Sequence, residues 1–272
     1  MSGKWISLIS LSRKCLMTTI VLFCAYILPV QDVYARETNL CNDFQSDITY
    51  YFETDNLINL GEFFAVGAVF ANTNLDSYVR NRWQSSIRSR SLDRILTVPN
   101  AFAEYSVFYF PIYVVTAMIG QWFPNNLDAI DAYEWGYQSA RTFVLGGIQQ
   151  AVFTNLLGSG RPYLGQSSRW TPFRYKFGVS GHAMYGAIPL LTIANMSDTP
   201  IIKGLMYFLS ALPAISRINN DKHYFSQAFL GWSIAFLTSR SVARTNLSDA
   251  EYNVFVGPTP DNGVRLLVVA KF

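Results

Sequence analysis

Histidine is scarce in this chain, whose 272 residues include only two, His182 and His223. Histidine is the side chain whose ordinary pKa lies near neutral pH, which suits it to proton transfer and nucleophilic attack. No imidazole other than these two is present for such chemistry. Any histidine-based chemistry must use one or both of them. Because both fall within residues 177–227, this stretch is the first candidate for a functional site.

Cysteine is also rare, with three in the chain. Two of them, Cys15 and Cys24, fall within residues 1–35, which leaves Cys41 alone in the remainder. A lone cysteine excludes an internal disulfide in the chain that follows. The fold must therefore be held together by packing.

Residues 1–35 have the features of an export signal. A positive start is followed by the apolar segment 16–30, and Val33-Tyr34-Ala35 fits the small-x-small pattern of a cleavage site. We expect a mature chain that begins at Arg36 and is exported to the periplasm. The alternative is an uncleaved anchor in the inner membrane, for which the apolar segment is short.

Charged residues make up only 14% of the chain and leave a net charge of +3, against 50% hydrophobic residues. So small a positive excess gives no reason to expect a nucleic-acid partner. The densest basic run is expected to form a solvated face, or to contact lipid head groups, on an amphipathic segment. Its members are Arg80, Arg82, Arg88, Arg90 and Arg94.

The mature chain also lacks an apolar run as long as a membrane span. Its runs extend over roughly a dozen to sixteen residues, below the ~20 that cross a bilayer as a helix. We therefore expect helices buried against one another in a single domain, residues 36–272, with one face able to contact the membrane. The predicted helices cover 57–71, 107–118, 142–157, 183–195, 201–215 and 225–238.

The C-terminus changes from a helical period to a pattern typical of strands. Residues 252–256 and 264–270 are rich in β-branched side chains and flank the turn-forming segment 257–263. This arrangement predicts a short β-hairpin within residues 252–271. We expect it to pack on the helical core, since a single hairpin cannot close a membrane barrel.

Ser180-Gly181-His182 directly precedes an apolar run that is predicted to be helical. Ser180 can cap the start of this helix. The free N–H groups and positive dipole end of a helix N-terminus form a cradle for phosphate oxygens, and Gly181 lets the backbone approach closely. His182 lies on the first turn beside this cradle. A capped helix with an ordinary histidine is the alternative.

His223 and Gln227 lie four positions apart at the start of the last predicted helix, so they share one face. The side-chain oxygen of Gln227 can accept from one ring nitrogen of His223 and leave the other free as a nucleophile. Arg217 precedes them, and Arg161 ends an earlier helix. Each arginine offers a planar fork of donors that matches two phosphate oxygens, although either can also be a surface residue.

Three ordered motifs resemble those of the type 2 phosphatidic acid phosphatase and vanadium haloperoxidase superfamily. They are Arg161-Pro162, Ser180-Gly181-His182, and Ser216-Arg217 followed by His223. The resemblance covers about residues 142–238. It implies an all-α fold, a helical bundle with the site at its centre, to which the predicted hairpin is a short addition.

The resemblance also implies a phosphatase that needs no metal or other cofactor. In that family, the histidine of the third motif attacks phosphorus to give a phosphohistidine, and the histidine of the second motif protonates the leaving group. These roles pass to His223 and His182, and Gln227 would support the nucleophile. The implied phosphate-binding residues are Arg161, Arg217, Ser180 and Gly181. The expected partner is a phosphorylated small molecule or lipid: a lipid phosphate, an isoprenoid diphosphate or a small phosphate ester.

Three positions depart from the family's motifs. Thr154 stands in place of a phosphate-binding lysine, and Val179 in place of a proline before the second motif. Gln227 replaces an aspartate, and it lacks the negative charge that stabilises a cationic imidazole. Candidate substitutes for the lost charges are Lys176, Arg169 and Asp221.

Three other functions are open to this chain. The lost lysine and aspartate are compatible with a non-catalytic protein that binds phosphate or lipid in the cell envelope. The same fold also supports vanadate-dependent halide oxidation, in which His223 would bind vanadate, the one cofactor to consider. Zinc binding by His182 and His223 is disfavoured, because no Cys or Glu ligands lie at metal spacing.

Overall fold

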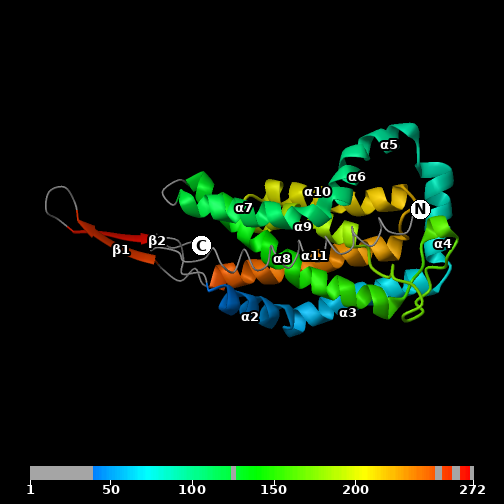
Figure 1. Cartoon of the computed structure of the whole chain (residues 1–272), viewed down its shortest axis with the longest axis horizontal. Helices are drawn as coiled ribbons and strands as arrows, with labels where there is room; N and C mark the ends of the chain where they lie inside the picture. Colours follow the sequence, from blue (N-terminus) through cyan, green and yellow to red (C-terminus); the bar gives the residue numbers. More distant parts are fainter. Residues whose placement is uncertain (1–38, 124–126, 249–252, 259–263, 270–272) are drawn as a thin grey trace, which may run out of the picture. The chain divides into compact units, whose positions relative to one another are not determined.

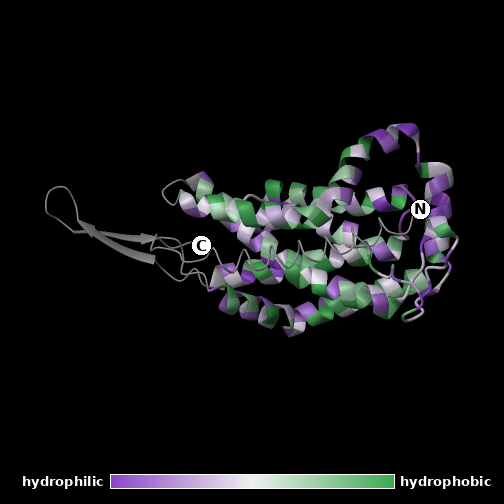
Figure 2. Cartoon of the chain, viewed as in Figure 1, coloured by the Kyte–Doolittle hydropathy of each residue, from purple (hydrophilic) through white to green (hydrophobic). Residues whose placement is uncertain are grey.

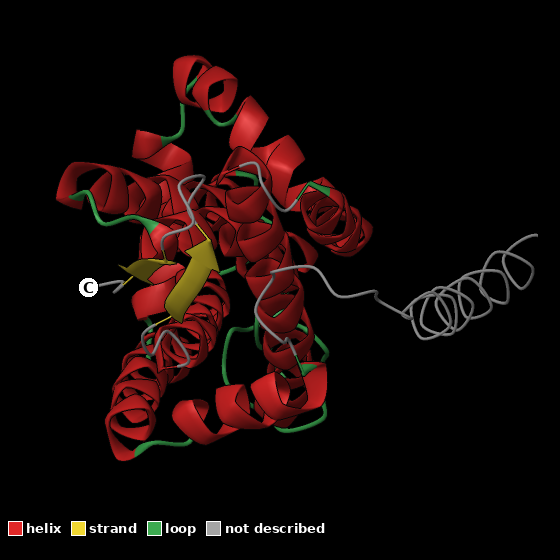
Figure 3. Cartoon of the chain, turned by 90° about the vertical axis from the view of Figure 1, so that its left-hand side faces the viewer, coloured by secondary structure: helices red, strands yellow, loops and turns green. Residues whose placement is uncertain are grey.

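The structure is a computed structural model, and it describes residues 39–123, 127–248, 253–258 and 264–269. Throughout these ranges the regular structure is helical apart from one β-hairpin, as Figures 1 and 3 show. The expected all-α bundle with a short hairpin is therefore confirmed. The predicted export signal lies outside the described residues and stays a prediction, as does the single domain 36–272.

Long helices build the bundle, and shorter ones connect them. The long helices are α2 (Leu40–Tyr51), α3 (Thr54–Asn72), α7 (Tyr109–Trp122), α8 (Leu127–Leu157), α9 (Gly181–Met196), α10 (Pro200–Asn219) and α11 (Phe225–Ser248). The shorter elements are α4 (Leu75–Arg82), a π-helical turn η1 (Trp83–Ile87), α5 (Arg90–Ile95), α6 (Thr97–Tyr105), and the 3₁₀ turns η2 (Ser106–Phe108) and η3 (Pro162–Leu164).

Local sequence explains where the helices of the site begin and end. Helix α8 ends at Leu157, before the predicted stop at Pro162, because Gly158 adopts a left-handed conformation (φ +58°). A Cβ atom at Gly158 would lie 1.8 Å from the Thr171 carbonyl oxygen, so only glycine fits this turn. Helix α9 begins after Ser180, whose Oγ accepts a hydrogen bond from the Ala183 N–H at 3.3 Å. The predicted cap is therefore confirmed.

The core of the bundle lies between α9 and α11. Helix α9 packs against α8, α10, α11 and α6, while α7 packs on α8, and α2 and α3 pack on α11. Met184, Ile188 and Leu191 of α9 are fully buried against Leu230 and Ile234 of α11. Both helices carry a histidine motif at their N-terminal side, so this core fixes the two motifs relative to each other.

The helices are longer than the apolar runs predicted. Helix α8 spans 31 residues, α10 spans 20 and α11 spans 24. Twenty residues extend about 30 Å, the thickness of the hydrocarbon core of a bilayer. The expectation that the helices are too short to cross a membrane was wrong, because charged residues such as Asp128, Asp131 and Glu134 precede the apolar run of α8 without ending the helix.

Outward-facing sides of the long helices are apolar. Two segments, Thr97–Trp122 and Pro200–Asn219, are long and apolar enough to cross a membrane, and only 22% and 33% of their most apolar windows is buried. Hydrophobic residues run along the long helices, whereas hydrophilic ones gather on α4 and α5 (Figure 2). Packing against other helices therefore covers only a minor part of the apolar surface of these two segments. Exposed examples on the long helices are Val69, Ile112, Ile148, Ile201 and Phe208.

The predicted C-terminal hairpin is present. Strand β1 (Asn253–Pro258) pairs antiparallel with β2 (Val264–Val269), with Asn253 opposite Val269 and Pro258 opposite Val264. The strands fall within the two segments that the sequence pattern indicated. The expected packing of this hairpin on the helices stays a prediction.

Candidate active site

The three motifs meet at one cavity of about 190 Å³. Both histidines line it, together with Arg161 and Gly181. The cavity lies where the loop after α8, the start of α9 and the loop before α11 come together. Its other lining residues are Val107, Gln150, Lys176, Phe177, Val179 and Tyr185. Arg161 and His223, which are 62 positions apart in the sequence, thus share one small space.

A tight turn places His223 beneath the end of α10. The N–H groups of Lys222 and His223 both donate to the carbonyl oxygen of Arg217, at 2.9 and 3.3 Å. Asp221 takes a left-handed conformation (φ +56°) to complete the turn. His223 itself is only 4% exposed, so the turn holds its ring inside the protein with one side toward the cavity.

Gln227 fixes the orientation and tautomer of the His223 ring. Its Nε2 donates to the Gly160 carbonyl oxygen at 2.6 Å, and its Oε1 accepts from the Tyr224 N–H at 3.2 Å. These two contacts determine which end of the amide is oxygen. That oxygen lies 2.9 Å from Nδ1 of His223, so Nδ1 must carry the proton and donate. The other ring nitrogen, Nε2, keeps its lone pair.

The N-terminus of α9 is pressed against α11 beside His223. The Ser180 N–H donates to the Gln227 carbonyl oxygen at 3.0 Å. A Cβ atom at Gly231 would lie 2.3 Å from the Ser180 carbonyl oxygen, so glycine permits this approach. Gly181 and His182 follow directly and line the cavity. The helix start expected to cradle phosphate therefore does face the two histidines.

Of the two arginines predicted to bind phosphate, Arg161 lines the cavity and Arg217 is not among its lining residues. Arg161 stacks on Phe177, with its guanidinium carbon 4.1 Å from the ring centre. Arg217 donates through one terminal nitrogen to Asn100 and Glu104, at 3.1 and 3.2 Å. In each arginine the buried Nε has no hydrogen-bond partner within the described parts of the chain. Buried unpaired donors are unusual, and a bound anion would satisfy them.

Burial and neighbouring positive charge lower the pKa of both histidines. Burial, followed by the charge of Arg161, lowers the pKa of His223 to about 3, and the hydrogen bond to Gln227 opposes this shift. Burial, then Arg217 and Arg161, also lowers the pKa of His182, whereas the Glu104 carboxylate raises it. A neutral His223 is a nucleophile, while His182 is set to take up a proton when an anion offsets the arginines.

The departures from the family's motifs have distinct structural consequences. Thr154 lies 3.4 Å, through its Oγ1, from both the N–H and the carbonyl oxygen of Val179, so it holds the backbone before Ser180. Of the two candidate substitutes for the lost lysine, Lys176 lines the cavity of the histidines, and Arg169 lines a different cavity. Lys176 is therefore the cation in position to replace it.

Asp221 is not available to replace the lost aspartate. Its two carboxylate oxygens accept from Nε and a terminal nitrogen of Arg80, both at 2.6 Å. This pair joins α4 to the turn before His223 and occupies both carboxylate oxygens of Asp221. The zinc alternative also gains no support, because no three His, Cys, Asp or Glu side chains converge within the described ranges.

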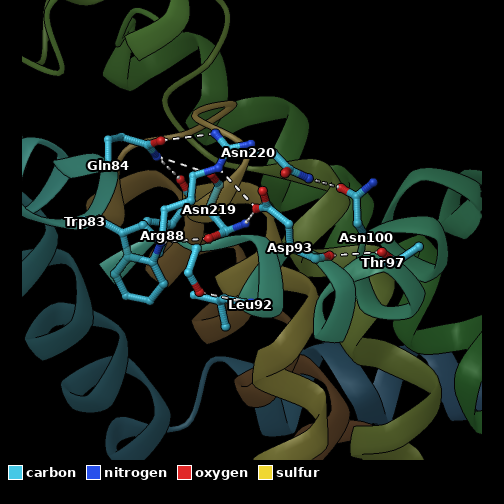
Figure 4. A network of polar contacts seen from close by, with 11 residues as sticks. Trp83, Gln84, Arg88, Leu92, Asp93, Thr97, Asn100, Asn219 and Asn220 are labelled. Carbon is cyan, nitrogen blue, oxygen red and sulfur yellow. Dashed lines mark hydrogen bonds and ion pairs between the residues drawn. The ribbon is translucent and has the colours of Figure 1, made fainter. Parts of the chain in front are cut away.

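A polar network that the sequence did not indicate holds the turn between α10 and α11 (Figure 4). Trp83 Nε1 donates to the Asn219 side-chain oxygen at 3.1 Å, and the Asn219 amide donates to Asp93 at 2.7 Å. Asn220 donates to Asn100 at 2.7 Å, the same oxygen that accepts from Arg217. Residues 83–100 therefore brace Arg217 and the turn that precedes His223. The Asn-Asn pair beside the histidine was the only signal of this role.

Comparisons with known proteins agree with this arrangement. Residues 136–247 match the family model described as PAP2 superfamily. A search of curated proteins gave no match. The crystal structure of a transmembrane PAP2 type phosphatidylglycerolphosphate phosphatase from Bacillus subtilis superposes with a TM-score of 0.52 at 18% sequence identity. The match covers 70% of this chain and 96% of that one, which shows a shared fold.

Proposed function

The chain belongs to the PAP2 superfamily through residues 136–247, and we propose that it is a metal-independent phosphatase in which His223 is the nucleophile. The observation that carries this proposal is the pairing of a buried imidazole with two buried, unpartnered guanidinium donors. His223 presents an unprotonated Nε2, and Arg161 and Arg217 each keep a free Nε–H. This combination suits an anion that a nitrogen nucleophile attacks.

The first chemical step forms a bond from Nε2 of His223 to phosphorus and breaks the bond from phosphorus to the leaving oxygen. His182, protonated when the phosphate dianion is bound, gives its proton to that oxygen. In the second step His182 takes a proton from water, and the water oxygen attacks phosphorus. The phosphorus–nitrogen bond breaks, phosphate leaves, and His223 returns to its neutral form.

The other residues stabilise the charge on the transferred phosphoryl group. Arg161 and Arg217 supply guanidinium donors, and the start of α9 supplies the backbone N–H of Gly181, since the Ser180 N–H already donates to the Gln227 carbonyl oxygen. Lys176, which lines the same cavity, adds the charge that Thr154 does not provide. Because positioning and charge stabilisation dominate phosphoryl transfer, this set of donors supports catalysis without an aspartate at position 227.

We infer that the bundle is embedded in a membrane and that the substrate is an amphiphile. Two helical segments have the length and composition of membrane spans and leave most of their apolar windows uncovered. Large exposed apolar patches on a protein need a cover, and lipid is the cover that suits several helices at once. A lipid phosphate or an isoprenoid diphosphate therefore fits the site better than a small soluble ester.

A catalytically inactive phosphate-binding protein is the second candidate. Gln227 favours it, because a neutral amide does not stabilise the imidazolium-like charge that develops on His223 during attack. On this alternative the two arginines and the start of α9 still bind phosphate, and no phosphorus–nitrogen bond forms.

Phosphate release distinguishes the two functions. The full-length protein, purified in detergent, is assayed with phosphatidic acid, an isoprenyl diphosphate and an aryl phosphate, in the presence of a chelator. We expect release from at least one substrate, and loss of release in His223→Ala but not in the surface variant Lys203→Ala on α10. Phosphate binding without release, equal in wild type and His223→Ala, would favour the binding protein.

A further inference from the structure

A second cavity lies in the loop that joins α8 to α9, separate from the cavity of the histidines. Its volume is about 340 Å³, and every lining residue comes from positions 165–175. The lining residues are Gly165, Gln166, Ser167, Arg169, Thr171, Arg174 and Tyr175. We propose that this loop cavity is a second anion site, which binds a phosphate-bearing group through Arg169 and Arg174.

Both charged residues that line the loop cavity are arginines. The sequence contains no Asp or Glu between Glu134 and Asp198. Within the described residues, neither Arg169 nor Arg174 forms an ion pair, in contrast to Arg80, which is paired with Asp221. Two arginines without a counter-ion at one cavity attract an anion, and their forked donors match the oxygens of phosphate.

Backbone hydrogen bonds hold the loop, and Arg174 also stacks over Tyr175, with its guanidinium carbon 5.2 Å from the ring centre. The backbone bonds run from Thr171 N–H to the Leu157 carbonyl oxygen at 2.9 Å and from Tyr175 N–H to the Gly158 carbonyl oxygen at 3.2 Å. The Gly160 N–H likewise donates to the Ser167 carbonyl oxygen at 2.9 Å. The cavity is therefore already shaped before a ligand binds, and the two guanidinium groups are available to it.

The loop also presents an aromatic ring outward beside the arginines. Phe173 is 71% exposed and has a left-handed backbone (φ +63°), which a bulky residue rarely adopts. Its N–H donates to the Asn155 carbonyl oxygen at 2.9 Å, and this bond holds the conformation. An exposed ring next to cationic side chains is typical of a segment that meets the lipid–water boundary. A lipid head group is therefore the expected source of the phosphate.

Gln166 connects the two cavities. Its side-chain oxygen accepts from the Arg161 N–H at 3.0 Å, and its carbonyl oxygen accepts from the Tyr224 hydroxyl at 2.7 Å. The same residue lines the loop cavity. The proposed site is thus next to the active site but shares none of the residues assigned to phosphoryl transfer, so its test does not depend on catalysis.

Binding of anions to the full-length protein in detergent tests the proposal. One arm counts retained dioleoylphosphatidylglycerol and dioleoylphosphatidylcholine by native mass spectrometry, and the other measures inorganic phosphate by calorimetry. The test variant is Arg169→Gln/Arg174→Gln. Its matched control is Arg90→Gln/Arg94→Gln on α5, which removes the same charge from exposed arginines elsewhere.

Loss of each arginine should weaken anion binding at the loop cavity roughly fivefold, so the test variant should bind there about 25-fold more weakly than wild type. At the concentrations used, it should therefore retain one anion fewer. Loss confined to phosphatidylglycerol assigns the site to a lipid head group, and loss of inorganic phosphate without lipid preference assigns it to free phosphate. The charge-retaining variant Arg169→Lys/Arg174→Lys should keep most of the binding, which separates charge from loop folding. Equal binding by wild type, test variant and control in both arms would overturn the proposal.

Discussion

Nδ1 of His223 lies 2.9 Å from Oε1 of Gln227, and the amide nitrogen of Gln227 lies 2.6 Å from the carbonyl oxygen of Gly160. The second contact requires a donor, which a carboxylate lacks. The amide is therefore matched to this protein's own loop, where it connects the Gly160 backbone to the ring that faces the phosphate cavity. Gln227 therefore uses both ends of its amide, at the position where the family's motif has an aspartate.

Restoring a carboxylate at position 227 should reduce activity. In Gln227→Glu, a carboxylate oxygen would face the Gly160 carbonyl oxygen across 2.6 Å with no proton between them. We expect a loss of stability of about 1–3 kcal/mol, the cost of a buried unpaired polar group, and a fall in kcat. Thermal unfolding and phosphate release measure the two effects. The exposed variant Gln45→Glu on α2 is the control, and a Gln227→Glu enzyme that is more active than wild type would contradict the amide's role.

Activity should be greatest in acid. The productive form has neutral His223 and protonated His182. His223 stays neutral above a pKa of about 3, and His182 is protonated only below its own pKa, which burial and the arginines lower from its ordinary value of 6.5. We therefore expect kcat/KM for an aryl phosphate to fall about tenfold per pH unit above pH 6.5. An optimum above pH 7.5 would contradict this assignment.

Glu104 should set the position of the alkaline limb of that profile. Its carboxylate raises the pKa of His182 and contacts Arg217 at 3.2 Å. In Glu104→Gln the pKa of His182 should fall, which moves the alkaline limb to lower pH and leaves the acid limb of His223 in place. A pH profile of kcat/KM for the two enzymes checks this. Parallel movement of both limbs would indicate a general loss of structure instead.

Each arginine of the site should contribute strongly to the transition state. Arg217 is 4% exposed, so its guanidinium acts in a poorly solvated environment. We expect Arg217→Gln and Arg161→Gln each to lower kcat about 100-fold, as for loss of one oxyanion donor. Lysine at either position should restore only part of the rate, because its ammonium group cannot donate two parallel hydrogen bonds as a planar guanidinium does. Arg94→Gln, an exposed change on α5, should leave the rate within twofold of wild type.

The protein should resist extraction from membranes. The apolar windows of 97–122 and 200–219 are mostly uncovered, so removal from lipid would expose them to water. After alkaline carbonate treatment of membranes from expressing cells, we expect the protein in the pellet, and detergent should release it. A soluble marker protein must leave the pellet in the same experiment. Release by carbonate alone would restore the expectation of helices that are buried only against one another.

The sequence was sufficient for the fold class and for part of the cavity lining, whereas Ser180 and Arg217, also predicted to bind phosphate, are not among the lining residues. His182, His223, Arg161 and Gly181 carry distinctive chemistry at fixed spacing, and all four line the cavity. The Gln227 contact followed from a helical spacing of four residues. These predictions succeeded because each depends on local geometry or on residue types that are rare in this chain.

Other features depend on contacts between distant segments, which spacing does not reveal. The Asn219 amide reaches Asp93, and Asp221 is paired with Arg80 on a helix that precedes it by 141 positions. Helix lengths were underestimated for a different reason: the polar residues of α8 are tolerated inside a bundle where they bond to neighbouring helices, as Ser139 does to Thr192 at 3.0 Å. Apolar runs alone therefore understate how far such helices extend.

The most direct test of the account is to locate the phosphoryl group on the enzyme during turnover. Trypsin cleaves after Lys176, Lys203, Lys222 and Arg240, so His182 and His223 fall in different peptides, 177–203 and 223–240. Wild type is mixed with a ³²P-labelled substrate, quenched in alkali within milliseconds and digested. We predict an acid-labile, alkali-stable label on peptide 223–240, absent in His223→Ala. Label on peptide 177–203, or turnover with no label on either peptide, would contradict the claim that His223 is the nucleophile.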